Sequence, residues 1–223
     1  MQLSLSPLVH LIDGMPAYQE LLKRLRKKGS AVSRVLVLDA AKPYLMAAVY
    51  QSLQLPVLVV TAQPENAKRL YEQLSLWSNS REINLFPEPD ILPYQRTIPD
   101  SLAEQERIQV LYSLSGMAER KAPPLIIVSA PALIQKTISR VDFASAVHTI
   151  EVGNEFDPLS LMDKWTSMGY QVETLVEAPG RISRRGGIID IFPPTSDLPV
   201  RLEFFGNTVE SIRLFDPSSQ RSQ

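Results

Sequence analysis

Three arginines stand within five residues of one another, at positions 181, 184 and 185, and Gly186 and Gly187 follow them directly. Guanidinium groups form paired hydrogen bonds with carboxylates and phosphates. A bend at the two glycines would leave these groups as a local positive patch. The pattern therefore indicates a place where an acidic group of a protein, or a phosphate of a nucleic acid, could be recognised.

Polar and apolar side chains alternate in the segment PVRLEFF, residues 199–205. In a strand, Arg201, Glu203 and Phe205 would share one face, and the apolar residues between them would share the other. Arginine and exposed aromatic residues are enriched at protein interfaces. Two other interpretations stay open: Phe205 in a small core with the arginines paired to acids such as Glu203 and Asp190, or contact with nucleic acid.

Catalytic and metal chemistry find little support. The chain has no cysteine and two histidines, His10 and His148, which excludes disulfides, thiolate zinc sites, a catalytic thiol and a histidine cluster. His148 has no evident acid or serine partner, and Ser129 has no nucleophile motif around it and is interpreted as a helix cap. We therefore expect no catalytic, cofactor-binding or metal-binding residue in this chain.

The loop Asp39–Pro43 stands where an ATP site would be in an α/β sheet, after the first expected strand. A phosphate-binding loop needs glycines, a lysine and a following serine or threonine. This loop has Lys42 but no glycine and no hydroxyl after the lysine, in a chain with 9 glycines and 18 prolines. We expect no ATP binding here.

The overall charge also limits the function classes. With 23 basic and 24 acidic residues the net charge is -1, so no global field draws the chain to DNA or to an anionic membrane. The longest apolar runs have the length of strands, far below the roughly 20 residues of a membrane span. The amino terminus has no secretory signal pattern. A cytoplasmic protein without a membrane partner is expected.

Helical and strand patterns alternate in the first part of the chain, which is typical of an α/β domain with a parallel sheet. The expected strands are residues 32–38, 56–62, 83–86 and 125–129, and the expected helices between and around them are residues 15–28, 41–53, 65–77 and 101–119. Crossovers of this length predict parallel strands.

The pattern changes after about residue 145. A strand is expected at 147–152, then a helix that begins after Asp157 and ends at Gly169. Strand follows strand in the remainder, and Gly206–Asn207 is a two-residue hairpin loop between the last two. We predict a small α+β domain with an antiparallel sheet.

The motif RGGIIDIFPP followed by RLEFFG, residues 185–194 and 201–206, is long and ordered. Together with IEVGNEFDPLSLMDKWTSMGY and LFPEPDILPY, it resembles the amino-terminal module of the bacterial transcription-repair coupling factor family, which is itself similar to UvrB, a component of excinuclease ABC. The resemblance covers nearly the whole chain. Ser183 stands where UvrB more often has arginine, which favours the coupling factor.

The resemblance implies three parts: a helicase-like α/β domain with a degenerate phosphate loop and no ATP site at about 1–145, a domain at 146–216 that binds UvrA, another component of excinuclease ABC, and the start of a return segment at 217–223. It maps partner binding onto Arg185, Arg201, Glu203 and Phe205. Arg184 stands where the family often has an apolar residue.

The implied function is a non-catalytic adaptor that brings UvrA to lesions where RNA polymerase has stalled. The parent protein would be an ATP-dependent DNA translocase that also binds RNA polymerase and double-stranded DNA, with ATP and magnesium only in a motor outside this chain. The alternatives are an ATP-binding or a DNA-binding module of a protein similar to UvrB, the latter through Arg181, Arg184 and Arg185.

Overall fold

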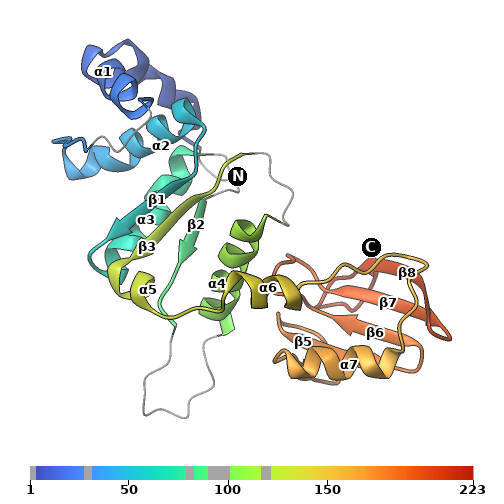
Figure 1. The fold of residues 1–223 in the computed structure, drawn as a ribbon. Helices are drawn as coiled ribbons and strands as arrows, with labels where there is room; N and C mark the ends of the chain where they lie inside the picture. The colour runs from blue at the N-terminus through green and yellow to red at the C-terminus, as the bar shows by residue number, and fades with distance from the viewer. Residues whose placement is uncertain (1–3, 28–31, 79–82, 90–100, 117–121, 223) are drawn as a thin grey trace. The chain divides into compact units, whose positions relative to one another are not determined.

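A computed structural model describes most of the chain, in the ranges 4–27, 32–78, 83–89, 101–116 and 122–222. The chain forms two compact units: unit 1 consists of residues 1–89 and 116–135, and unit 2 consists of residues 90–115 and 136–223 (Figure 1). The domain boundaries expected from the sequence, at 145 and 216, stay predictions. Much of the proline-rich segment, at 90–100, lies outside the described residues.

Unit 1 is an α/β layer around a parallel sheet of three strands in the order β1-β3-β2. This confirms the predicted α/β class and the parallel pairing, whereas the helicase-like character stays a prediction. Its elements are η1 (Ser6–Gly14), α1 (Pro16–Leu25), η2 (Asp39–Ala41), α2 (Lys42–Leu53), β1 (Val57–Thr61), α3 (Pro64–Trp77), β2 (Ile83–Phe86), β3 (Leu125–Ser129) and α5 (Ala130–Ile134).

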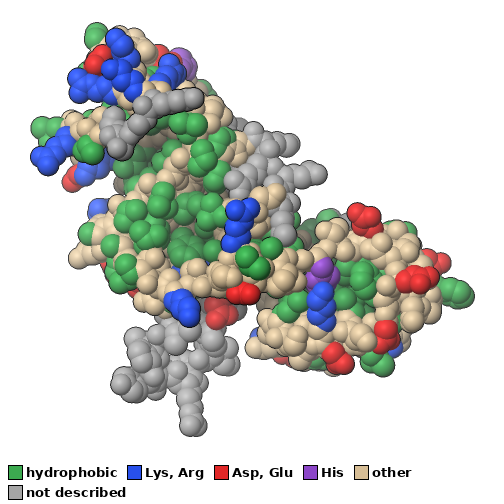
Figure 2. Space-filling model, viewed as in Figure 1, with side chains coloured by type: hydrophobic (Ala, Val, Ile, Leu, Met, Phe, Trp, Pro, Cys, Tyr) green, Lys and Arg blue, Asp and Glu red, His purple; other side chains and the backbone are tan. Residues whose placement is uncertain are grey.

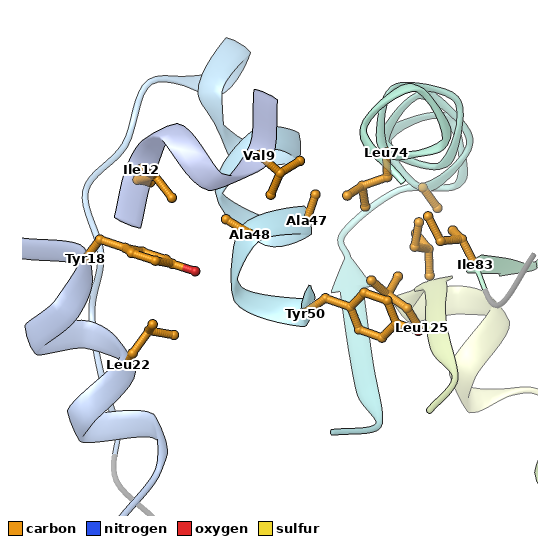
Figure 3. Packing of buried hydrophobic residues seen from close by; sticks show 12 residues of the cluster. Val9, Ile12, Tyr18, Leu22, Ala47, Ala48, Tyr50, Leu74, Ile83 and Leu125 are labelled. Atoms are coloured by element: carbon orange, nitrogen blue, oxygen red, sulfur yellow. The ribbon is translucent and has the colours of Figure 1, made fainter. Parts of the chain in front are cut away.

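The core of unit 1 lies between the sheet and its helices (Figure 3). All five residues of β3 are buried because this strand is central. Tyr50 of α2 extends its ring toward Leu125 of β3, and its hydroxyl donates a hydrogen bond to the carbonyl oxygen of Pro123 at 2.5 Å. Ala47 and Ala48 are buried on α2, and their small side chains allow η1 to pack closely against this helix.

The expected strand at 32–38 is wrong. None of the described residues 32–38 is in a strand, and Val32, Leu36 and Leu38 are 93%, 101% and 81% exposed. An apolar run becomes a strand only where a neighbour completes its backbone hydrogen bonds. None of the three strands of this sheet pairs with the segment. Leu58 and Val60 of β1 are exposed as well, and Figure 2 shows apolar side chains gathered over this part of unit 1.

Unit 2 has a mixed sheet of five strands in the order β4-β5-β6-β7-β8. Its elements are α4 (Ser101–Ser115), α6 (Arg140–Ala146), α7 (Pro158–Ser167), β4 (Gln171–Val172), β5 (Arg181–Arg185), β6 (Ile188–Ile191), β7 (Val200–Phe205) and β8 (Thr208–Leu214). The prediction of an antiparallel sheet is correct for β5 to β8, but β4 pairs with β5 in parallel. Residues 173–180 return the chain to the end at which β4 began, so β5 runs the same way.

The strand expected at 147–152 is also absent from the described structure. A turn ends this segment, with Gly153 at a φ of 88°. The side chain of Ile150 packs against the core of the sheet. Among the described residues, backbone pairing of this part of the chain with the sheet consists of the bridge between Glu155 and Thr208 and its flanking hydrogen bonds. Because the chain turns before it can run along β8, no ladder forms.

Helix α7 begins and ends where the sequence predicts. Its N-cap is Asp157, which accepts hydrogen bonds from the backbone N–H groups of Leu159 and Ser160 and from the Ser160 hydroxyl. These bonds, that from the hydroxyl most of all, hold the pKa of Asp157 below its ordinary value. Gly169, with a φ of 101°, follows the last turn. No helix in the described ranges is long and apolar enough to cross a bilayer.

A candidate partner-binding face

Helix α7 covers one face of the unit 2 sheet. Leu161, Met162 and Trp165 of the helix are buried against apolar side chains of β5 to β8. The side chains that alternate with these apolar strand residues point the other way. We call this second surface the open face. It consists of Ser183, Arg185, Ile188, Asp190, Arg201, Glu203, Phe205, Ser211 and Arg213.

Strand register arranges the open face in two rows. The outer row consists of Arg185, Ile188, Glu203 and Ser211, which are cross-strand neighbours in turn from β5 to β8. The inner row consists in the same way of Ser183, Asp190, Arg201 and Arg213. The two rows lie two residues apart along each strand, which is the spacing of side chains on one face.

Asp190 is the centre of the inner row, with a side chain only 2% exposed. Arg201 binds it with two hydrogen bonds, from Nε to Oδ1 at 2.7 Å and from Nη2 to Oδ2 at 2.9 Å. Arg185 reaches down from the outer row and donates from Nη2 to Oδ2 at 3.1 Å. One buried carboxylate therefore holds two guanidinium groups.

The two arginines differ in exposure. The side chain of Arg201 is 17% exposed and that of Arg185 is 54% exposed. Arg201 also lies over the ring of Phe215, 4.8 Å from its centroid, and donates from Nη1 to the carbonyl oxygen of Gln220 at 3.4 Å. Its hydrogen bonds to Asp190 raise the pKa of Arg201. Arg201 is thus enclosed, and Arg185 is presented to solvent.

Glu203 forms a separate pair in the outer row. Its Oε2 accepts a hydrogen bond from the hydroxyl of Ser211 at 2.6 Å and lies 3.7 Å from Nη2 of Arg213. The side chains of Glu203 and Arg213 are 32% and 52% exposed. Solvent weakens the attraction within such a pair. The opposite charges of Glu203 and Arg213 leave this part of the face close to neutral.

Phe205 is the most exposed apolar residue of the open face, at 80%. It ends β7, and the Gly206–Asn207 turn follows it as predicted, with Phe205 opposite Thr208 and Gly206 at a φ of 62°. The interpretation that places Phe205 in a small core is therefore wrong, although its pairing of arginines with acids is correct for Arg185 and Arg201, which both bind Asp190.

The three clustered arginines do not form one patch. Arg184 lies opposite Ile189 and shares the face that α7 covers, whereas Arg185 is on the open face. Arg181 is paired with Glu173 at 2.9 Å. This division argues against a single phosphate-binding cluster.

Other residues considered from the sequence have structural contacts. Ser129 caps α5 by accepting a hydrogen bond from the backbone N–H of Ala132 at 3.2 Å, as predicted. His148 accepts one from the indole of Trp165 at 3.1 Å. No group of three or more metal-ligating side chains occurs among the residues that the structure describes.

The loop expected to have lost its ATP site lies in unit 1. Lys42 is the first residue of α2, and its Nζ lies 2.5 Å from Oδ1 of Asp39. In a phosphate-binding loop the lysine faces the phosphates. The ammonium of Lys42 faces a carboxylate instead.

Sequence reasoning assigned no role to Asp190 beyond a possible salt bridge and did not consider Ser211 or Arg213. The Gly186–Gly187 turn predicts the register of β5 and β6. A two-residue turn places Arg185 opposite Ile188, and therefore Ser183 opposite Asp190. No comparable signal aligned β6 with β7, since residues 192–199 connect them.

Residues 149–223, which include α7 and the five-stranded sheet, match the family model of the UvrB interaction domain. The chain is 34% identical over 222 residues to the transcription-repair-coupling factor of Myxococcus xanthus, covering 97% of this chain and 17% of the relative. It is 32% identical over 168 residues to that of Bacillus subtilis and 29% identical over 167 residues to that of Escherichia coli, in both cases covering 75% of this chain and 14% of the relative.

The part of unit 2 from α7 to β8 is thus similar to the UvrB interaction domain. The chain as a whole fits the amino-terminal module of the transcription-repair-coupling factors, which confirms the resemblance seen in the sequence motifs. It spans 14% to 17% of the length of these relatives.

Proposed function

We propose that this chain is a non-catalytic adaptor module of transcription-coupled nucleotide excision repair, which recruits the excinuclease ABC component UvrA to lesions where RNA polymerase has stalled. The observation that carries the proposal is the open face within a UvrB interaction domain, where Phe205 is 80% exposed and Arg185 presents a guanidinium. An exposed aromatic and an exposed arginine on one face are typical of an interface hot spot.

The roles of the four predicted residues differ in this proposal. Phe205 is the apolar anchor, and Arg185 makes a charge-assisted contact. Arg201 and Glu203 complete the face while bound to Asp190 and to Ser211. A partner that fits would offer an apolar pocket for Phe205 and a carboxylate for Arg185.

The test is the affinity of the 223-residue chain for purified UvrA, measured by calorimetry. We expect Phe205→Ala and Arg185→Ala each to weaken binding by roughly 1–4 kcal/mol, the range of hot-spot residues. Leu159→Ala is the matched control, because Leu159 is also an exposed apolar residue, at 57%, but lies on α7. A double variant of Phe205 and Arg185 that binds like the wild type would refute the proposal.

For the longer protein we propose an ATP-dependent DNA translocase of bacterial cytoplasm, which also engages RNA polymerase and double-stranded DNA, with ATP and magnesium bound outside this chain. Unit 1 is then a helicase-like domain whose phosphate loop is degenerate. The pairing of Lys42 with Asp39 and the absence of glycine from Asp39–Pro43 support this. Micromolar binding of ATP by the chain would contradict it.

A further inference from the structure

Asp190 is a buried carboxylate whose two oxygens are both paired with arginines. Its side chain is 2% exposed, and both carboxylate oxygens accept hydrogen bonds from arginines. Burying a carboxylate is strongly unfavourable unless it is paired, and an apolar trio would stabilise a fold at least as well. The group is therefore better explained by what it does to the two arginines than by stability alone.

We propose that Asp190 is the positioning residue of the open face: it anchors Arg201 within unit 2 and, on that anchor, holds Arg185 toward the partner. This inference rests on the proposed function and adds a residue that touches no partner itself. We expect the partner to offer a carboxylate, which would bind the exposed edge of the Arg185 guanidinium.

The hydrogen-bond geometry supports a division of work between the two arginines. Arg201 uses Nε and Nη2 on the carboxylate, stacks on Phe215 and is 17% exposed. Within the described part of the chain, Arg185 makes one hydrogen bond, through Nη2. That bond uses one of the two Nη2 hydrogens. The other Nη2 hydrogen remains, and it lies beside an N–H of either Nε or Nη1. These two N–H groups form one edge of the guanidinium that is available to a partner. Such an edge can bind a carboxylate with two parallel hydrogen bonds.

The charges of Asp190 and the two arginines also support binding of a carboxylate at Arg185. Asp190 contributes one negative charge and the two arginines contribute two positive charges, so the trio carries one net positive charge. Because Arg201 is enclosed, this charge is presented at Arg185, while Glu203 and Arg213 offset each other nearby. Holding a long side chain in one conformation before binding also reduces the entropy lost when the partner docks.

The test is a double-mutant cycle between Asp190→Asn and Arg185→Ala, read as affinity for UvrA. Asparagine keeps the shape of Asp190 and removes its charge. We expect about a tenfold loss of affinity from Asp190→Asn in the wild-type background and less than a twofold loss when Arg185 is already alanine. Equal losses in both backgrounds would show that Asp190 does not act through Arg185 and would overturn the inference.

Loss of the buried charge can also unfold unit 2, so a second variant keeps the test decisive. Asp190→Asn combined with Arg201→Gln leaves no unpaired charge at the centre of the inner row while Arg185 remains. We expect this variant to melt close to the wild type and to bind UvrA about tenfold more weakly. Wild-type affinity in a folded sample of this variant would contradict the positioning role.

A measurement without a partner separates this inference from the proposed function. Nuclear magnetic resonance of arginine side chains reports whether rotation of the Arg185 guanidinium is slowed. We expect slow rotation in the wild type and fast rotation in the variants of Asp190; fast rotation in the wild type would refute positioning whatever the partner is. If the double variant of Phe205 and Arg185 binds UvrA like the wild type while Arg185 rotation depends on Asp190, the proposed function fails and the positioning of Arg185 stands.

Discussion

Trp165 donates its indole N–H to Nε2 of His148 across 3.1 Å, and this bond joins α7 to the segment that precedes it. Trp165 is 3% exposed. The other ring nitrogen of His148, Nδ1, lies 3.3 Å from the carbonyl oxygen of Ala146, which can only accept. Nδ1 therefore carries the hydrogen, and Nε2 offers its lone pair to the indole.

Replacing this histidine should destabilise unit 2. His148→Ala leaves the buried indole N–H of Trp165 without an acceptor, which costs about 1–3 kcal/mol. Urea unfolding followed by tryptophan fluorescence measures the loss. The other histidine of the chain provides the control, because His10 is exposed and its replacement by alanine should be nearly neutral. Equal stability of the two variants would contradict the assigned role.

Gly187 should tolerate no side chain. A Cβ at this position would lie 2.9 Å from the carbonyl oxygen of Phe204, a backbone atom that cannot move without shifting β7. We expect Gly187→Ala to destabilise the chain by about 1–3 kcal/mol in thermal unfolding, as overpacking does. Gly14→Ala is the comparison, since a Cβ there meets nothing within 4 Å. A Gly187→Ala variant as stable as Gly14→Ala would refute the close approach.

Tyr170 should make stability sensitive to alkaline pH. Burial raises the pKa of Tyr170 from its ordinary value of 10.0 to about 12, because the phenolate loses hydration. The stability contributed by the neutral phenol is fully present below pH 10 and is lost as the pH rises toward 12. Tyr170→Phe should lose less stability than the wild type across this window in urea unfolding. Parallel pH dependence of the two proteins would contradict the assignment.

Arg201 should matter for folding as well as for binding. Arg201→Ala leaves the buried Asp190 with Arg185 alone, and breaking a buried ion pair costs about 3–5 kcal/mol. The control is Arg213→Ala, which removes a half-exposed pair at 3.7 Å. We expect the control to change unfolding free energy by less than about 1 kcal/mol. An Arg201→Ala variant with the stability of Arg213→Ala would refute the buried anchor.

Several features were predictable from residues close in sequence. Asp157 followed by Pro158 indicated the start of α7, and Gly206–Asn207 indicated the last hairpin; both are confirmed. The alternation in Val200–Phe205 correctly predicted which side chains share a face. A cap, a two-residue turn and a strand periodicity each depend on neighbours only a few residues away.

The failed predictions depended on distant partners. Residues 32–38 have the apolar composition of a buried strand, yet no strand of the described sheet binds them. Composition measures the tendency of a segment to be buried, whereas a strand also needs a neighbour that completes its backbone hydrogen bonds. The same reason explains why residues 147–152 form no strand and why β4 was not expected to run parallel to β5.

The sequence by itself determined the class of unit 1, the last hairpin of unit 2, the family resemblance and the set of candidate residues on the open face. Only the tertiary structure decided that Asp190 joins Arg185 to Arg201, that Arg201 is enclosed by Phe215 and Gln220, and that Phe205 is exposed. These relationships require β6 and β7 to align across residues 192–199 and the segment after β8 to return over the sheet. Long-range pairing of this kind is selected by packing and hydrogen bonding of the whole unit, which no local pattern encodes.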